Sequence, residues 1–149
     1  MTLISSHTIQ RAGQWSGAAD HCVLTYDERF LRRKRLVAVE GTVFLVDLAH
    51  TVSLNHGDAF ELTDGCLIAV EAAQEELLEI TGEDLVRLAW HIGNRHCPCQ
   101  VEPARLLIQN DHVIHDMLTL LGATLRDVTE AFCPEGGAYG HGRTHSHAH

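Results

Sequence analysis

Histidine is concentrated at the end of this chain. Four of its twelve histidines fall within the last nine residues: His141, His145, His147 and His149. The stretch has no apolar side chain larger than alanine, so it cannot bury enough surface to offset the entropy of ordering it, and we expect a disordered arm. Neutral imidazole is the commonest metal ligand in proteins. A native metal-binding tail is favoured over a purification-tag remnant, because tags are usually uninterrupted histidine runs.

A second group of possible ligands lies in the middle of the chain: His91, His96, Cys97 and Cys99. A helix is predicted over 84–92, and His91 falls beside its apolar seam rather than on it. Gly93 is expected to close this helix as a left-handed cap. His96 then lies in a turn that ends at Pro98, where side chains project into solvent or into an interface. Loop residues of this kind often carry function.

A third group lies on a second predicted helix, which begins at Asn110 or Asp111 and stops at Gly122. His112 and His115 are one turn apart and opposite the apolar face, so both should be solvated. Their spacing suits one cation held by two imidazoles, and it suits an ordinary polar helix face equally well. The predicted core face comprises Val113, Ile114, Met117, Leu118, Leu120 and Leu121.

The elements that would position these groups change character along the chain. Short β-rich runs separated by turn signals fill the first part, and a strand–helix–strand–strand–helix–strand order follows. The sequence therefore predicts an α+β protein with three parts. These are a small β-rich N-terminal domain (1–72), a ferredoxin-like βαββαβ domain (73–133) and a Gly/His-rich tail (134–149). Each domain alone would be marginally stable, which makes oligomerisation a reasonable expectation.

The composition and charge of the chain exclude some classes of binding partner. The chain of 149 residues has a formal net charge of −9, which makes nucleic acid an improbable partner. No apolar run approaches the ~20 residues needed to cross a bilayer, and the N-terminus lacks the pattern of a signal peptide. We therefore expect no membrane association and a cytoplasmic location. Cys22, Cys66 and Cys133 are expected to be small buried hydrophobes rather than ligands.

One stretch of this acidic chain is strongly basic. Arg32-Arg33-Lys34-Arg35 follows closely after Arg29. A solvated turn between strands is the favoured interpretation. The alternative is a docking patch for an acidic protein partner, which would act mainly on the rate of encounter.

The segment Trp90-His91-Ile92-Gly93-Asn94-Arg95-His96 closely resembles the GNRH signature of the UreE family, the nickel metallochaperones of urease maturation. Further pieces occur in the order of that family, and the resemblance covers nearly the whole chain. These pieces are Gly57-Asp58-Ala59-Phe60, Asp64-Gly65, Ala72-Ala73-Gln74-Glu75, Asp111-His112-Val113, Pro134-Glu135-Gly136-Gly137-Ala138-Tyr139 and the His-rich end.

The resemblance implies a β-rich, peptide-binding-like first domain and a ferredoxin-like domain that binds metal and forms a homodimer. It implies that His96 of each chain contributes to one shared nickel ion, that His112 is a secondary metal position, and that the tail histidines are accessory ligands. Zinc or copper are further ions that such a site could hold. The implied partners are the urease accessory GTPase, UreG, and the complex that loads nickel into apo-urease. No catalytic activity is implied.

This sequence departs from the family pattern in two places. Asn110 stands where some members have a histidine, so the secondary site would be weak or shifted to His115. Cys97 and Cys99 directly follow His96, and two thiolates at the metal would favour Zn²⁺ or Cu(I) over Ni²⁺. A structural or incidental role is the favoured interpretation of both cysteines.

Two other functions remain open on the sequence. A nickel or zinc storage protein would use the same tail without a delivery partner. A zinc-dependent hydrolase would need three protein ligands and a general base, and no HExxH or comparable motif occurs. Delivery is the main hypothesis: two imidazoles leave the ion incompletely coordinated, the tails supply further ligands, and the metal leaves by ligand exchange.

Overall fold

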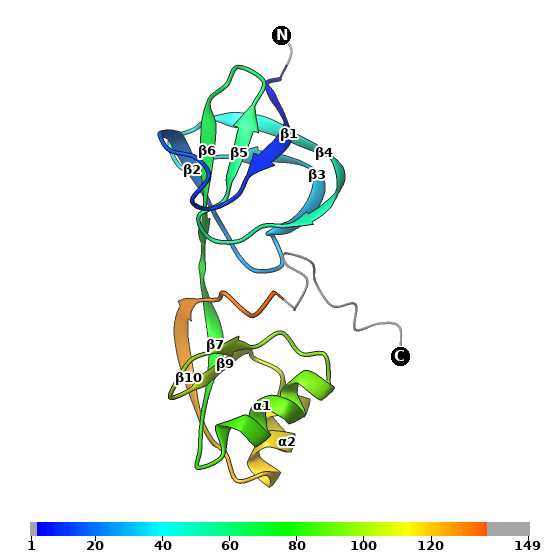
Figure 1. The fold of residues 1–149 in the computed structure, drawn as a ribbon, viewed down its shortest axis with the longest axis vertical. Helices are drawn as coiled ribbons and strands as arrows, with labels where there is room; N and C mark the ends of the chain where they lie inside the picture. The colour runs from blue at the N-terminus through cyan, green and yellow to red at the C-terminus, as the bar shows by residue number, and fades with distance from the viewer. Residues whose placement is uncertain (1–2, 137–149) are drawn as a thin grey trace. The chain divides into compact units, whose positions relative to one another are not determined.

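The computed structural model describes residues 3–136, which fall into two compact units divided between Ala73 and Gln74. The first unit contains six strands, drawn from blue to green in Figure 1. They are β1 (Ser5–Gln10), β2 (Ala18–Leu24), β3 (Phe30–Val37), β4 (Val43–Ser53), β5 (Ala59–Leu62) and β6 (Leu67–Ala72). They form one sheet in the order β2-β6-β5-β1-β4-β3. The β1–β4 and β2–β6 pairs are parallel, and the other neighbours are antiparallel.

The first unit encloses an apolar core to which every strand except β1 contributes a buried apolar residue. Phe44 and Phe60 lie at its centre with ring centroids 5.4 Å apart. Cys22 packs in this core, as predicted, whereas Cys66 and Cys133 are exposed, so the prediction for those two was wrong. Cys66 directly follows the turn at Asp64-Gly65, and Cys133 follows the fully buried Phe132, which takes the interior position instead.

Two buried carboxylates organise the loops of the first unit. Asp58 is fully buried and accepts hydrogen bonds from Arg11 Nη1 (2.8 Å), Ala12 N (2.9 Å) and Asn55 N (2.7 Å). This gives a structural reason for the Gly-Asp-Ala-Phe motif, because one carboxylate ties two separate loops together. Asp20 holds the β3–β4 turn in the same way.

Asp20 accepts hydrogen bonds from the backbone N–H groups of His21 (2.8 Å) and Glu40 (2.9 Å), and Thr42 N is 3.3 Å away. Burial alone would raise the pKa of Asp20, but these donors outweigh it and lower the pKa to about 2. The carboxylate therefore stays ionised, and the turn keeps its anchor across the neutral range.

The basic run lies on strand β3, with Arg32 to Arg35 exposed, and does not form the predicted turn. Arg29, at the preceding turn, is buried and does not belong to the exposed run. Four charged residues lower the intrinsic β propensity of this segment, but pairing with β4 decides its conformation.

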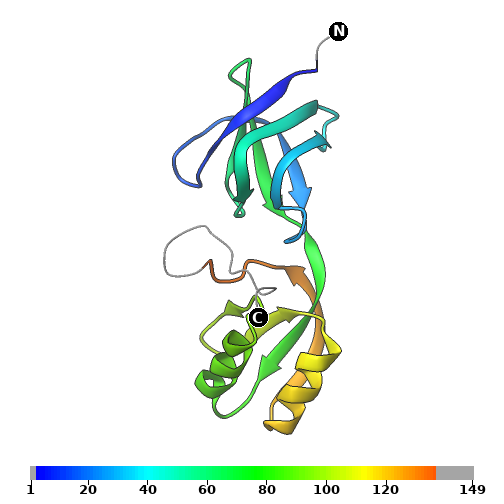
Figure 2. The ribbon, with the colours of Figure 1, turned by 90° about the vertical axis from the view of Figure 1, so that its right-hand side faces the viewer.

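The second unit has the order strand, helix, strand, strand, helix, strand, which is the ferredoxin-like βαββαβ order. Its elements are β7 (Gln74–Thr81), α1 (Leu85–Asn94), β8 (Gln100–Val101), β9 (Leu106–Gln109), α2 (His112–Leu120) and β10 (Thr124–Ala131). The antiparallel sheet has the order β10-β7-β9-β8. Both helices pack on one face of it (Figure 2). There the buried residues Leu78, Ile80, Leu106 and Ile108 of the sheet form one core with Leu88, Ile92, Ile114 and Leu118 of the helices.

The other face of this sheet carries an ion-pair network. Arg105 donates to Glu79 (2.9 Å), Glu102 (3.0 Å) and Glu130 (2.7 Å), and Arg126 also donates to Glu79 (3.1 Å), so the network links β7, β10 and the turn before β9. Hydrogen bonds from Arg126 and Arg105 lower the pKa of Glu79, and those from Arg105 lower the pKa of Glu130. The stabilisation is therefore present above the ordinary glutamate range and is lost as pH falls through the lowered values. Within residues 3–136, no helix is long and apolar enough to span a bilayer.

Candidate metal centre

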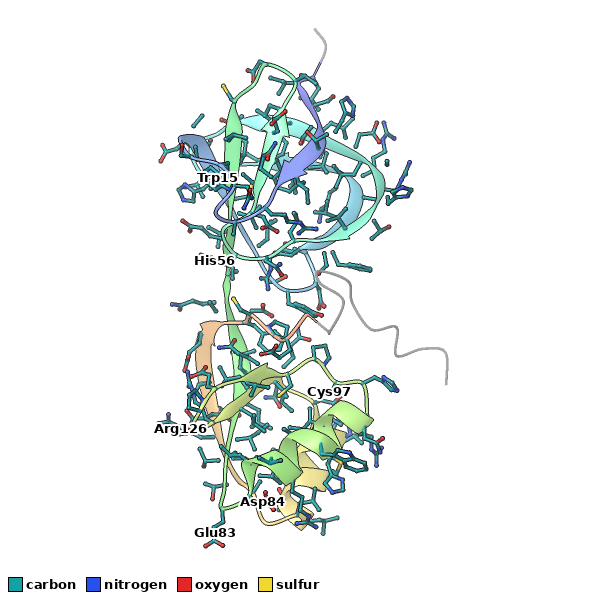
Figure 3. The ribbon with its side chains drawn as sticks, in the orientation of Figure 1. Trp15, His56, Glu83, Asp84, Cys97 and Arg126 are labelled. Atoms are coloured by element: carbon teal, nitrogen blue, oxygen red, sulfur yellow. The ribbon has the colours of Figure 1, made fainter. Side chains whose placement is uncertain are left out.

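The segment that carries His96 begins with a well-capped helix. The carboxylate of Asp84, labelled in Figure 3, accepts a hydrogen bond from Arg87 N at 3.1 Å. Leu88 and Ile92 are buried one turn apart. This is the amphipathic pattern that the sequence predicts. The helix ends later than predicted, at Asn94.

The helix C-terminus forms a Schellman motif with His96 at the left-handed position. His96 N donates to Gly93 O at 3.0 Å, and Cys97 N donates to Ile92 O at 3.3 Å. His96 has φ of 55°, and it is the one non-glycine residue with positive φ among residues 3–136. Gly93 is not in this conformation, so the predicted glycine cap was wrong. Gly93 remains inside the helix because the two hydrogen bonds of the motif are accepted by the carbonyls of Ile92 and Gly93. The helix therefore ends at Asn94, with Arg95 as its C-cap, and the left-handed residue is His96.

A histidine at this position is unfavourable for the backbone alone. The Cβ of an L-residue in the left-handed region costs on the order of 1–2 kcal/mol, which is why glycine is usual there. The imidazole of His96 is exposed on the loop after α1. Conformational strain of this kind clusters at functional positions, so His96 is a functional candidate on structural grounds as well.

Cys97 and Cys99 are half-buried against the apolar core of the second unit (Figure 3, where Cys97 is labelled). Their thiols face backbone carbonyls, Cys97 Sγ that of Pro98 at 3.7 Å and Cys99 Sγ that of Gln100 at 3.8 Å. Burial, with a contribution from Asp111, raises the pKa of Cys97 to about 11. Burial, together with Cys97 and Glu135, raises that of Cys99 to about 12. Because the thiolate is the metal-binding form, these values favour a packing role.

Three further candidate histidines lie on the two helices. His91 is half-buried, and its ring makes an edge contact with that of Trp90, with centroids 5.0 Å apart. His112 is exposed and is the first residue of α2, whose cap is Asp111, one of the two residues predicted for that position. The side chain of His115 is 45% exposed, and its Nδ1 lies 3.5 Å from a carboxylate oxygen of Asp116.

Helix α2 buries a narrower face than the sequence predicts. Ile114 and Leu118 are buried, and Met117 and Leu121 are partly buried. Val113 and Leu120, which were predicted in the core, are 52% and 89% exposed. A nine-residue helix on a small sheet presents only one i, i+4 row to the core, so apolar residues beside that row remain outside.

The structure does not gather the candidates into one site within a single chain. In the part of the chain from 3 to 136, no three side chains of His, Cys, Asp or Glu converge so as to hold a metal ion. The tail candidates His141, His145, His147 and His149 lie outside the described residues.

Residues that no sequence pattern indicated join the start of the C-terminal segment to this region. Phe132 is fully buried, Cys133 N donates to Gln100 Oε1 at 2.8 Å, and Glu135 N donates to Cys99 O at 2.9 Å. Residues 132–135 therefore run beside the end of the loop that carries His96. Gln100, which follows Cys97 and Cys99, belongs to no recognisable sequence motif. Only the structure could therefore reveal that it holds this segment.

The fold and these groups define a class: a two-unit α+β protein whose potential metal-binding side chains are displayed on an exposed loop and helix. Comparison with known proteins gives the family. Residues 3–73 match the N-terminal domain and residues 75–149 the C-terminal domain of the UreE urease accessory protein. The chain belongs to the UreE family, which consists of accessory chaperones rather than enzymes.

Similar proteins named urease accessory protein UreE occur in several bacteria. The chain is 67% identical to that of Ruegeria pomeroyi over 149 residues, covering 100% of both chains. It is 57% identical to that of Cereibacter sphaeroides over 148 residues, covering 99% of this chain and 81% of the relative. It is 59% identical to that of Rhodobacter capsulatus over 138 residues, covering 93% and 88%.

Proposed function

We propose that this protein carries Ni²⁺ to apo-urease during urease maturation, and that two copies share the ion through His96. Membership of the UreE family supports the role in urease maturation. The observation that carries the residue assignment is the left-handed conformation of His96, where an imidazole is kept at a position that favours glycine.

A homodimer explains how His96 could hold a metal ion although no three potential ligands converge within the described part of one chain. Two-fold symmetry places identical residues opposite each other, so one exposed histidine per chain becomes two ligands. Helix α1, which ends at this loop, carries Val86 and Trp90 one turn apart, 83% and 62% exposed. Large apolar side chains on one helix face support burial against a second copy.

Two imidazoles leave a first-row ion with open positions, and this suits a carrier that must release its metal. Ligands of the urease accessory GTPase, UreG, or of the urease complex would replace the carrier's ligands one at a time. His112 and His115 are accessible to solvent and could form a second, weaker metal site. His91 lies five residues before His96 and could contribute to the main metal site. Packing of Cys97 and Cys99 in the core supports nickel over the softer, thiolate-preferring ions.

The tail histidines would complete the coordination. Residues 132–135 are attached beside Cys99 and Gln100, so the histidine-bearing segment starts near the loop of His96. His141 is six residues beyond Glu135, a span of at most about 20 Å. Imidazoles tethered within that distance act at an effective concentration on the order of millimolar.

The proposal is tested by titrating the full chain with Ni²⁺ in a calorimeter and weighing the product by native mass spectrometry. We expect one tight ion per two chains, with further, weaker ions bound by the tails. A tight site with one ion per single chain, or a monomer that loads fully, would contradict the shared site. Capture of the urease accessory GTPase from nickel-fed, urease-positive cells would separate delivery from storage.

Deleting residues 141–149 should lower the total number of nickel ions bound while the dimer persists. The tight site should weaken by about tenfold, because tethered imidazoles no longer fill its open positions. Calorimetry and size-exclusion chromatography measure these two quantities. A matched chain in which the four tail histidines become alanine keeps the length of the tail, and unchanged stoichiometry in that variant would show the tail to be idle.

A further inference from the structure

The exposed basic side chains of the first unit lie on a single strand. Residues 1–73 contain six basic residues: Arg11, Arg29, Arg32, Arg33, Lys34 and Arg35. Arg11 is paired with the buried Asp58 at 2.8 Å, and Arg29 is buried with its guanidinium on the carbonyls of Leu24 (2.9 Å) and Leu54 (3.2 Å). The remaining four are consecutive and exposed on β3, and we call Arg32–Arg35 the basic edge.

The strand that carries the basic edge is the last one in its sheet. Among the described strands, β3 forms a hydrogen-bonded ladder with β4 alone, so the side of residues 32–37 away from β4 presents backbone donors and acceptors. Just beyond the strand, Val39 N donates to His21 O of β2 at 2.8 Å. The β4 residues opposite Lys34 and Arg35 are apolar, Val46 and Leu45. Arg33 alone of the four faces an acid, Asp47, at 3.7 Å with both side chains substantially exposed. Within residues 3–136, the other three make no ion pair.

The alternation of side chains along a strand restricts what could neutralise these charges. A register shift between Leu31 and Arg33 interrupts the regular pairing beside Arg32. From Arg33 onward successive residues alternate, so Arg33 and Arg35 share one face of the sheet and Lys34 lies on the other. A flat surface laid on one face would therefore not meet all of these charges. An extended segment running along the edge meets both sides, and it can also pair with the free backbone groups of β3.

We propose that the basic edge binds an extended acidic segment of a partner protein, which adds to the sheet beside β3. The charges attract and orient the segment, and backbone hydrogen bonds hold it in register. This surface lies in the first unit and is independent of the metal chemistry of the second.

Basic side chains on an edge strand also have a protective use, because they discourage edge-to-edge aggregation. Protection needs only that the charges discourage pairing of any other strand with this edge. The two roles differ in a measurable way, since a purely protective edge binds no added strand.

The test uses the full chain and a fluorescein-labelled ten-residue peptide of alternating Glu and Val, with binding followed by anisotropy at low salt. The double variant Arg32→Gln/Arg35→Gln should weaken binding by about tenfold or more, and added salt should weaken wild-type binding steeply. The matched control Arg87→Gln/Arg95→Gln has the same net charge of −11, since two positive charges are removed from −9, and should stay within about twofold of wild type.

Hydrogen exchange provides the structural measurement. The peptide should protect backbone amides within 30–37, and a peptide with the same number of Glu residues interrupted by Pro should not, because proline cannot continue a strand ladder. Equal weakening in both double variants would overturn the proposal, and so would peptide binding without protection of 30–37. Equally tight, edge-dependent binding of a DNA duplex or of anionic vesicles would also overturn it, by showing a surface for polyanions in general.

Discussion

Replacing His96 with alanine should remove the tight nickel site. In the proposed dimer this change deletes two ligands at once, one from each chain. Loss of groups that merely orient metal ligands already costs 10–100-fold in affinity, so loss of both ligands should weaken binding by more than about 100-fold. The measurement is competition calorimetry against a chelator of known affinity. The control is His112→Ala, an exposed histidine on α2 whose loss should affect only a weaker site.

His96→Gly separates the ligand from the backbone conformation. Glycine accepts the φ of 55° without the Cβ penalty, so this variant should unfold at higher denaturant than His96→Ala, by about 1 kcal/mol. Both variants should lose nickel to the same extent. A tight site that survives in either variant would remove His96 from the metal centre. Equal stability of the two would mean that the left-handed backbone imposes no strain.

Replacing Asp58 with alanine should destabilise the first unit by about 3–5 kcal/mol, the range for removing one partner of a buried charged group. The substitution leaves Arg11 without its carboxylate, and the backbone N–H groups of Ala12 and Asn55 lose their acceptor. Asp58→Asn keeps one acceptor oxygen and should fall between wild type and alanine. Urea denaturation followed by tryptophan fluorescence measures the change, because Trp15 donates to Gly57 O beside this carboxylate.

The matched control for Asp58 is Asp64→Ala. Asp64 also belongs to a glycine-containing turn of the first unit, but it is exposed, and it accepts hydrogen bonds from the backbone N (2.9 Å) and the thiol of Cys66. Its loss should cost under about 1 kcal/mol. Similar losses in both variants would show that burial of Asp58 does not determine its contribution. The nickel stoichiometry of folded Asp58→Ala should match wild type, since the proposed site belongs to the second unit.

The sequence by itself determined the features that depend on local order along the chain. Apolar spacing in the two helices, the Asp111 cap and the change from strand-rich to mixed segments all predicted elements that the structure contains. Motifs around His96 and in the β-rich half indicate the family, and the family matches confirm it. These features are readable because periodicity and capping act over a few neighbouring residues.

Only the tertiary structure decided the features that depend on contacts between distant segments. Pairing with β4 makes the basic run a strand, and the sheet beneath α2 leaves Val113 and Leu120 outside the core. The hydrogen bonds that end α1 put His96, instead of Gly93, in the left-handed conformation. Attachment of Glu135 to Cys99 joins residues 36 positions apart. Pairing and burial of this kind depend on which distant segments pack together in the folded chain. A local sequence pattern does not contain that information.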